Sequence, residues 1–141
     1  MHKPNFNAGD LVDHNAVSAI IKNDAGEVLV FFHHKYQEWT IPVGKAEQGQ
    51  TVEDALRMEI SEECGLELIS FKKDLIKKYV YPREKKDINV ELHQFTVDKY
   101  TGIPQNLEPK KHSNMQFMSV AELQKLDNRM DVLDLFVSTQ V

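Results

Sequence analysis

The chain has 141 residues, of which 41% are hydrophobic and 28% charged, and its formal net charge is -5. This length suits one domain with its own hydrophobic core, and the composition excludes a disordered or fibrous chain. The negative net charge, without a continuous Lys/Arg stripe, argues against a dedicated nucleic-acid-binding protein.

The cysteine content and the start of the chain favour a cytoplasmic protein. Cys64 is the only cysteine, which excludes an internal disulfide and favours a reducing compartment. Nearby carboxylates are expected to raise its pKa, which disfavours a nucleophilic role. No apolar run approaches the roughly 20 residues that span a bilayer, and the opening "MHKPNFNAGD" lacks the apolar core of a signal peptide. We therefore expect a cytoplasmic protein without a membrane partner.

The first part of the chain is predicted to form strands. Residues 16–22 and 27–34 are rich in β-branched and aromatic residues, and the turn sequence "NDAG" between them predicts a hairpin. Residues 38–43 predict a short strand that lies at an edge or ends at Pro42. A loop flanked by glycines, residues 44–49, follows.

A helix over residues 51–64 is predicted next. Thr51 and Asp54 form a capping-box pattern at its start, and Gly65 supplies its end. Two longer strands over residues 66–81 and 88–100 follow, then a loop rich in Pro, Gly and Asn. This loop covers residues 101–114. A strand over residues 115–120 follows it, and helices over residues 120–126 and 130–138 are expected last. We expect one mixed α/β domain over residues 1–141.

The central helix places carboxylates on its apolar face. On a wheel of about 100° per residue that starts at Val52, Glu59 falls at roughly 340° and Glu63 at roughly 20°. Both angles lie inside the stripe that the apolar residues define, and Glu62, at roughly 280°, borders it. The apolar residues of this stripe are Val52, Ala55, Leu56 and Ile60.

Carboxylates on a buried face need a cation beside them, because buried negative charges are costly and repel one another. A Lys or Arg from another element is one candidate. The i, i+3, i+4 spacing favours the other candidate, a divalent metal with oxygen ligands such as Mg²⁺, which keeps waters for substrate phosphates. The glycines of the preceding loop allow close backbone approach, and Lys45 is placed to meet phosphate.

The segment from Gly44 to Leu66, "GKAEQGQTVEDALRMEISEECGL", resembles the Nudix box, G-x5-E-x7-R-E-U-x-E-E-x-G-U, where U is aliphatic. The matching residues are Gly44, Glu59, Ile60, Glu62, Glu63, Gly65 and Leu66. The resemblance implies an α/β/α sandwich around a mixed β-sheet. It also implies a Mg²⁺ site, with Mn²⁺ as a substitute, whose ligands are the Gly44 carbonyl and the carboxylates of Glu59, Glu62 and Glu63.

The same resemblance implies hydrolysis of a nucleoside diphosphate linked to another group. Similarity of "PQNLEPKKHSNMQF" to MutT-like members favours a (d)NTP, cut to the monophosphate and pyrophosphate. Glu62 or Glu63 would deprotonate the attacking water, Lys45 would neutralise phosphate charge, and Trp39 would stack on the base unless it is a core residue. ADP-ribose, an NDP-sugar and a dinucleoside polyphosphate are alternative substrates, and a non-catalytic nucleotide-binding module is the rival function. A homodimer remains an open alternative.

Three positions depart from the family pattern. Gln50 replaces the first box glutamate and Met58 the box arginine, a paired loss that leaves no charge stranded. Gln116 stands where MutT-type members carry a further acidic ligand, which Glu108 or Glu91 could supply instead. Arg57 faces away from the carboxylates on the wheel and is not expected to replace the box arginine. Two substrate hints lie beyond the box: Tyr81 as a base-stacking candidate and Pro82 at an ADP-ribose-type position.

Overall fold

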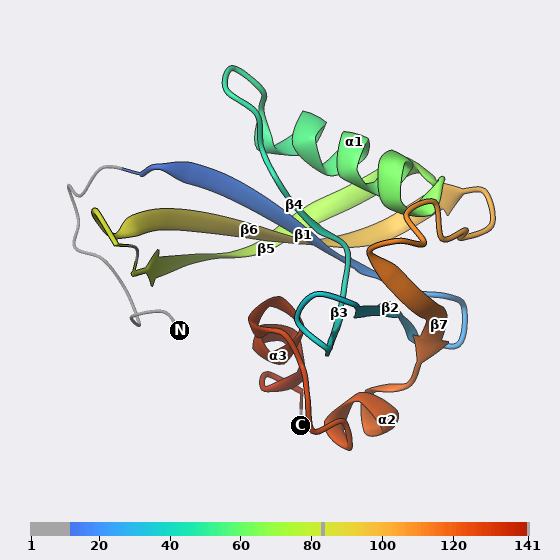
Figure 1. Cartoon of the computed structure of the whole chain (residues 1–141). Helices are drawn as coiled ribbons and strands as arrows, with labels where there is room; N and C mark the ends of the chain where they lie inside the picture. Colours follow the sequence, from blue (N-terminus) through green and yellow to red (C-terminus); the bar gives the residue numbers. More distant parts are fainter. Residues whose placement is uncertain (1–11, 83, 141) are drawn as a thin grey trace.

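Two β-sheets and three helices make up the described part of the computed structural model, which covers residues 12–82 and 84–140 (Figure 1). The larger sheet has the strand order β4-β1-β6-β5, with β1 and β6 parallel and the other pairs antiparallel. Its strands are β1 (His14–Ile21), β4 (Val43–Lys45), β5 (Glu67–Tyr81) and β6 (Ile88–Thr101). The smaller sheet is antiparallel, in the order β3 (Glu38–Thr40), β2 (Val28–His33) and β7 (His112–Met118).

Helices cover the larger sheet from opposite sides. Helix α1 (Val52–Cys64) lies over one face, and α2 (Val120–Gln124) and α3 (Asp131–Val137) lie on the other side (Figure 1). Two buried clusters result: Leu56 and Ile60 of α1 belong to the first, and Leu133 of α3 belongs to the second. Strand β2 joins them, because Leu29 packs in the first and its neighbours on either side in the second. The expected α/β/α arrangement with a mixed sheet is confirmed.

The ends of α1 agree with the sequence. The Thr51 hydroxyl accepts a hydrogen bond of 3.0 Å from the Asp54 N–H, as an N-cap residue does. Gly65 ends the helix with a φ of 69°, a left-handed conformation that glycine adopts without a Cβ penalty. These local signals fix the register of the helix, and with it the side to which each glutamate projects.

The predicted hairpin over residues 16–34 is wrong in its pairing. Its turn forms, with the Gly26 N–H donating to the Asn23 carbonyl at 3.0 Å, but β1 and β2 enter different sheets. The two sides of the turn are joined by an isolated bridge between Lys22 and Val28 and by hydrogen bonds between Asn23 and Glu27. The physical reason is that β4 and β6 already occupy both edges of β1.

Two further boundaries differ from expectation. The predicted strand 38–43 is divided by Ile41 and Pro42 into β3 and β4, which belong to separate sheets, as the proline position suggested. Strand β7 begins at His112, inside the predicted loop, because His112 pairs with His33 of β2 and is buried. The two long strands and the two C-terminal helices lie where the sequence predicts them.

The N-terminal segment "MHKPNFNAGD" lies outside the described residues. Within residues 12–82 and 84–140, no helix combines the length and the apolar character that a bilayer crossing requires.

Candidate metal centre

Glu59 lies directly against the backbone of Gly44. A Cβ atom built on Gly44 would overlap the carboxyl end of the Glu59 side chain. Gly44 has an ordinary strand conformation, so glycine is required here for space rather than for a positive φ. Gly44 on β4 and Glu59 on α1 therefore lie in direct contact.

Glu63 is the buried member of the box glutamates. It is 3% exposed, and its Oε1 atom has no hydrogen-bond partner among the described residues. Burial, followed by the charge of nearby Glu59, raises the pKa of Glu63. Burial also raises the pKa of Glu59. The convergence of these two carboxylates matches the sequence expectation, and a cation beside them would favour the ionised form of Glu63.

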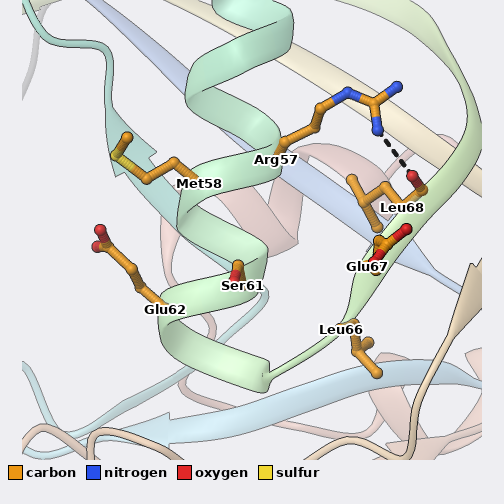
Figure 2. Close-up of a pocket in the computed structure, with 7 residues that line it drawn as sticks. All are labelled: Arg57, Met58, Ser61, Glu62, Leu66, Glu67 and Leu68. Atoms are coloured by element: carbon orange, nitrogen blue, oxygen red, sulfur yellow. Dashed lines mark hydrogen bonds between the residues drawn. The ribbon is translucent and has the colours of Figure 1, made fainter.

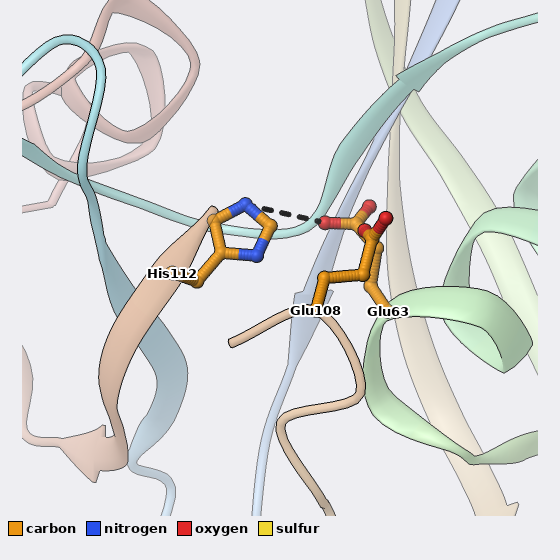
Figure 3. A group of neighbouring side chains, drawn as sticks. All are labelled: Glu63, Glu108 and His112. Carbon is orange, nitrogen blue, oxygen red and sulfur yellow. Dashed lines mark ion pairs between the residues drawn. The ribbon is translucent and has the colours of Figure 1, made fainter. Parts of the chain in front are cut away.

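The loop between β6 and β7 brings a third carboxylate to this point. The Gln105 N–H donates to the Cys64 carbonyl at 2.9 Å, and the Leu107 N–H donates to the Glu63 carbonyl at 3.2 Å. These bonds satisfy carbonyls of the last turn of α1, which have no partner within the helix. They place Glu108 beside Glu63, as Figure 3 shows. Of the two acids that the sequence left open as extra ligands, Glu108 is the one that lies at this point.

His112 completes the group. One ligand atom each from Glu63, Glu108 and His112 lie within 4.8 Å of one another (Figure 3). The His112 N–H donates to the Glu108 carbonyl at 3.0 Å, so one turn of backbone joins the two residues. Burial, followed by the charge of His33, lowers the pKa of His112 to about 4. The imidazole is therefore neutral at physiological pH and keeps a lone pair for a metal ion.

Lys111 supplies positive charge at the rim. Its Nζ lies 3.1 Å from Glu108 Oε2, and this contact raises the pKa of Lys111. The Lys111 side chain is 65% exposed. Glu63 Oε1 nevertheless has no hydrogen bond in the part of the chain that the structure describes, so the lysine does not satisfy the buried carboxylate. The donor set of carboxylates and one neutral imidazole fits a divalent cation.

Glu62 and Arg57 lie on different sides of α1 (Figure 2). Glu62 is exposed and points to the same side of α1 as Met58, whereas Arg57 points toward β5 (Figure 2). The Glu62 charge still reaches Glu59 and raises its pKa. Arg57 donates to the Leu68 carbonyl at 2.7 Å and lies over the Phe71 ring at 4.9 Å. The expectation that Arg57 does not replace the box arginine is confirmed.

The two altered box positions remain neighbours. Gln50 Nε2 lies 3.6 Å from Met58 Sδ, so an amide–thioether contact stands where the family pattern has a charged pair. Glu91, the other acid considered as a ligand, instead pairs with His93 at 3.0 Å. Gln116 is exposed on β7 and donates to the Asn114 carbonyl at 3.2 Å.

The two predicted substrate-binding residues lie apart from the carboxylates. Lys45 is exposed on β4 and, by strand alternation, projects to the face opposite Gly44. Trp39 packs partly buried against the second core cluster, with its ring edge-on to Phe32 at 5.5 Å. These contacts give Trp39 a packing role, and substrate contact by either residue stays a prediction.

A cavity of about 610 Å³ is separated from the centre by a row of contacting rings. His112 is edge-on to His33 at 5.4 Å, and His33 stacks on Tyr36 at 4.8 Å. Tyr36 lines the cavity together with Tyr81. The volume suits a small organic ligand, and the tyrosines offer flat surfaces for a ring.

Sequence reasoning missed His112 as a member of the centre. The only available signal was its position four residues after Glu108 in "EPKKH", in a segment that composition assigned to a loop. The expectation for Cys64 is confirmed, because burial and the charge of Glu63 raise its pKa to about 12.

A family comparison agrees with this geometry. The model of the NUDIX domain matches residues 12–136. The chain belongs to the Nudix family. A curated relative, an RNA pyrophosphohydrolase of Pseudomonas putida, is 43% identical over 51 residues, which are 36% of this chain and 32% of the relative. The chain thus aligns with about a third of the length of the curated relatives it matches.

Solved structures support the Nudix fold. A MutT NUDIX hydrolase from Burkholderia pseudomallei has a TM-score of 0.75 at 19% identity and covers 91% of this chain and 98% of its own. The NUDIX domain of Shewanella oneidensis NrtR, solved in complex with ADP ribose, has a TM-score of 0.69 at 13% identity, with coverage of 93% and 89%. At these identities the likeness concerns the fold alone.

Proposed function

We propose that this protein is a metal-dependent Nudix hydrolase that cleaves the pyrophosphate linkage of a nucleoside diphosphate derivative, with a (d)NTP as the first candidate substrate. The observation that carries the proposal is the buried Glu63 carboxylate, which lies beside Glu59 and Glu108 with one oxygen that finds no partner within residues 12–82 and 84–140. Such an arrangement is costly unless a cation binds there. A non-catalytic binding module has less use for it.

In this proposal some box residues bind the metal ion and another accepts a proton. Glu59 and Glu63 would hold the ion together with the Gly44 carbonyl, because they converge beside Gly44. A bound divalent ion such as Mg²⁺ or Mn²⁺ supplies positive charge against phosphate oxygens and the attacking water. Glu62 is exposed next to this pair and would accept the proton of the water. Lys111, at the rim, would meet phosphate charge in addition to Lys45.

The cavity beside Tyr36 and Tyr81 would take the nucleoside. Tyr36, which lines the cavity, stacks on His33, and His33 in turn contacts His112 of the centre. Stacking between a base and tyrosine is favourable for any base, which is consistent with a nucleotide but does not select one.

The test is a substrate panel with Mg²⁺ or Mn²⁺, with products resolved by chromatography. The panel holds (d)NTPs, ADP-ribose, an NDP-sugar, a dinucleoside polyphosphate and a 5′-triphosphorylated oligoribonucleotide. The last substrate follows from the name of the Pseudomonas relative and from Lys111, whose ammonium group pairs with Glu108 at the rim of the centre. Release of pyrophosphate from a (d)NTP supports the first candidate. Tight binding without turnover of any member favours the binding module instead.

Two variants separate the proposed roles. Glu62→Gln should lower turnover by about 100-fold or more while the metal-induced rise in melting temperature persists. Glu63→Gln should lose both turnover and most of that rise. Equal metal responses in the two variants would contradict this division of roles.

A further inference from the structure

We propose that His112 Nε2 and Glu108 are direct ligands of the ion at Glu63, and that the nitrogen ligand makes this centre select a first-row transition ion over magnesium. Both residues lie outside the Nudix box. The inference shares its site with the proposed hydrolase function but concerns ion binding, which is measurable without turnover.

The distances allow one ion to reach both buried residues. His112 Nε2 and Glu63 Oε2 are 3.9 Å apart, which is too long for a hydrogen bond. Two ligand atoms that each lie about 2.1 Å from one metal ion are at most about 4.2 Å apart. An ion therefore fits between these atoms as they stand. Glu108, whose side chain is 28% exposed, needs only a small movement to join them.

The imidazole is held in position before any ion binds. His112 is 5% exposed, and its ring contacts Phe31 with the centroids 4.1 Å apart. The His112 backbone pairs with His33 of β2, and the His112 carbonyl accepts a hydrogen bond of 2.7 Å from Asn106 Nδ2. Asn106 Oδ1 also accepts a hydrogen bond of 3.2 Å from the Glu108 N–H, so the Asn106 side chain fixes the backbone of both proposed ligands. Such preorganisation is what a metal site requires of its protein.

The alternative is a centre neutralised by Lys111, with His112 serving only to fill the core. Lys111 contacts Glu108 rather than Glu63, and both Glu63 Oε1 and His112 Nδ1 are buried without a hydrogen-bond partner among the described residues. An unpaired buried carboxylate oxygen such as Glu63 Oε1 destabilises the fold unless a ligand meets it. The lysine therefore leaves the buried part of the group unexplained.

The choice of ion follows from ligand chemistry. Mg²⁺ prefers oxygen ligands and retains its waters, whereas imidazole nitrogen suits first-row transition ions. A centre of carboxylates alone would discriminate weakly between Mg²⁺ and Mn²⁺. One imidazole in the ligand set shifts the preference toward Mn²⁺, Co²⁺ or Zn²⁺.

The experiment uses the full chain without nucleotide, loaded with Mn²⁺ as the probe. Pulsed electron paramagnetic resonance should detect coupling of the Mn²⁺ spin to a ¹⁴N nucleus. His112→Gln should abolish that coupling and reduce the ratio of the Mg²⁺ to Mn²⁺ dissociation constants by about tenfold or more. His93→Gln is the matched control, because His93 is a second buried histidine that pairs with Glu91 away from the centre. It should leave the coupling and the ratio unchanged.

The outcomes separate this inference from the proposed function. Absence of ¹⁴N coupling in the folded parent, or coupling that survives in His112→Gln, overturns the inference, and the parent measurement stands even if the variant does not fold. Failure of the parent to hydrolyse any nucleotide would overturn the proposed function but leave the coupling intact. Hydrolysis with Mg²⁺ alone, without nitrogen coupling to Mn²⁺, would overturn only the inference.

Discussion

Glu63 is the residue on which the candidate site most depends, because the fold buries its carboxylate and pairs one of its oxygens with none of the described residues. Glu59 raises its pKa further by lying next to it. A carboxyl group whose pKa is higher in the folded protein destabilises the fold once the pH rises above its unfolded value, because the unfolded chain ionises more easily. For Glu63 this window extends from about 4.5 to about 9 in the metal-free protein.

Replacement of Glu63 by glutamine should therefore stabilise the metal-free protein at high pH. At pH 8 in the presence of a chelator, we expect the free energy of unfolding to rise by about 1–3 kcal/mol, because the fold keeps the parent carboxyl group protonated while the unfolded chain ionises, and the amide has no such cost. At pH 5 the gain should be smaller, since this pH lies near the start of the window that opens at about 4.5. Urea unfolding at both pH values measures the difference. Glu62→Gln, at an exposed position, is the control and should change neither curve.

The contact between Gly44 and Glu59 gives a second residue-scale prediction. Gly44→Ala places a methyl group where the Glu59 side chain lies, so we expect a loss of about 1–3 kcal/mol in unfolding free energy. Glu59→Ala removes the obstacle, and the double variant should recover most of that loss. A double-mutant cycle from chemical denaturation provides the coupling energy. If Gly44→Ala is equally destabilising with and without Glu59, the space at Gly44 is not reserved for this side chain.

At the scale of elements, the centre is assembled by the attachment of a loop to a helix end. Backbone N–H groups of Gln105 and Leu107 bind carbonyls of the last turn of α1, and the chain then turns through Glu108 into β7. A second loop, before α1, approaches the same helix nearer its start. There Gln50 contacts Met58 and also accepts from the Glu47 N–H at 2.9 Å.

The Gln50–Met58 contact predicts that charge restored at only one of these positions does not help. Gln50→Glu keeps the acceptor for the Glu47 N–H but adds charge to an acidic segment, and Met58→Arg, at a position 48% exposed, adds a cation without a partner. Together they should form a charge-assisted pair with a coupling of about 1 kcal/mol in stability and about tenfold, or 1.4 kcal/mol, in turnover. A double-mutant cycle in both quantities measures this. Strict additivity would contradict the proposal that the two positions changed together.

At the scale of the whole molecule, the sequence predicts those features that depend on residues close together in the chain. The bounds of α1, its caps and the shared face of Glu59 and Glu63 depend on residues close in sequence, and they are confirmed. The pairing of β1 depends on β4 and β6, which are distant in sequence, and the hairpin prediction failed for that reason.

The candidate site shows the same division between local and distant determinants. The choice of Glu108 over Glu91 depends on backbone bonds from the β6–β7 loop to the end of α1, and these leave no side-chain signature in the sequence. His112 was missed because its burial against Phe31 overrides the loop-like composition that precedes it.

The two core clusters share strands of both sheets, which predicts that the described domain unfolds in one transition. Leu56 and Leu133 lie in different clusters, yet both are fully buried and β2 contributes side chains to each cluster. Leu56→Ala and Leu133→Ala should each lower the unfolding free energy by about 2–5 kcal/mol without separating the transition into two. Trp39, the only tryptophan, packs at the second cluster, so its fluorescence reports that side while far-UV circular dichroism reports the whole. Fluorescence and dichroism should give coincident curves for both variants, and curves that diverge in Leu133→Ala would show that the α3 side unfolds independently of α1.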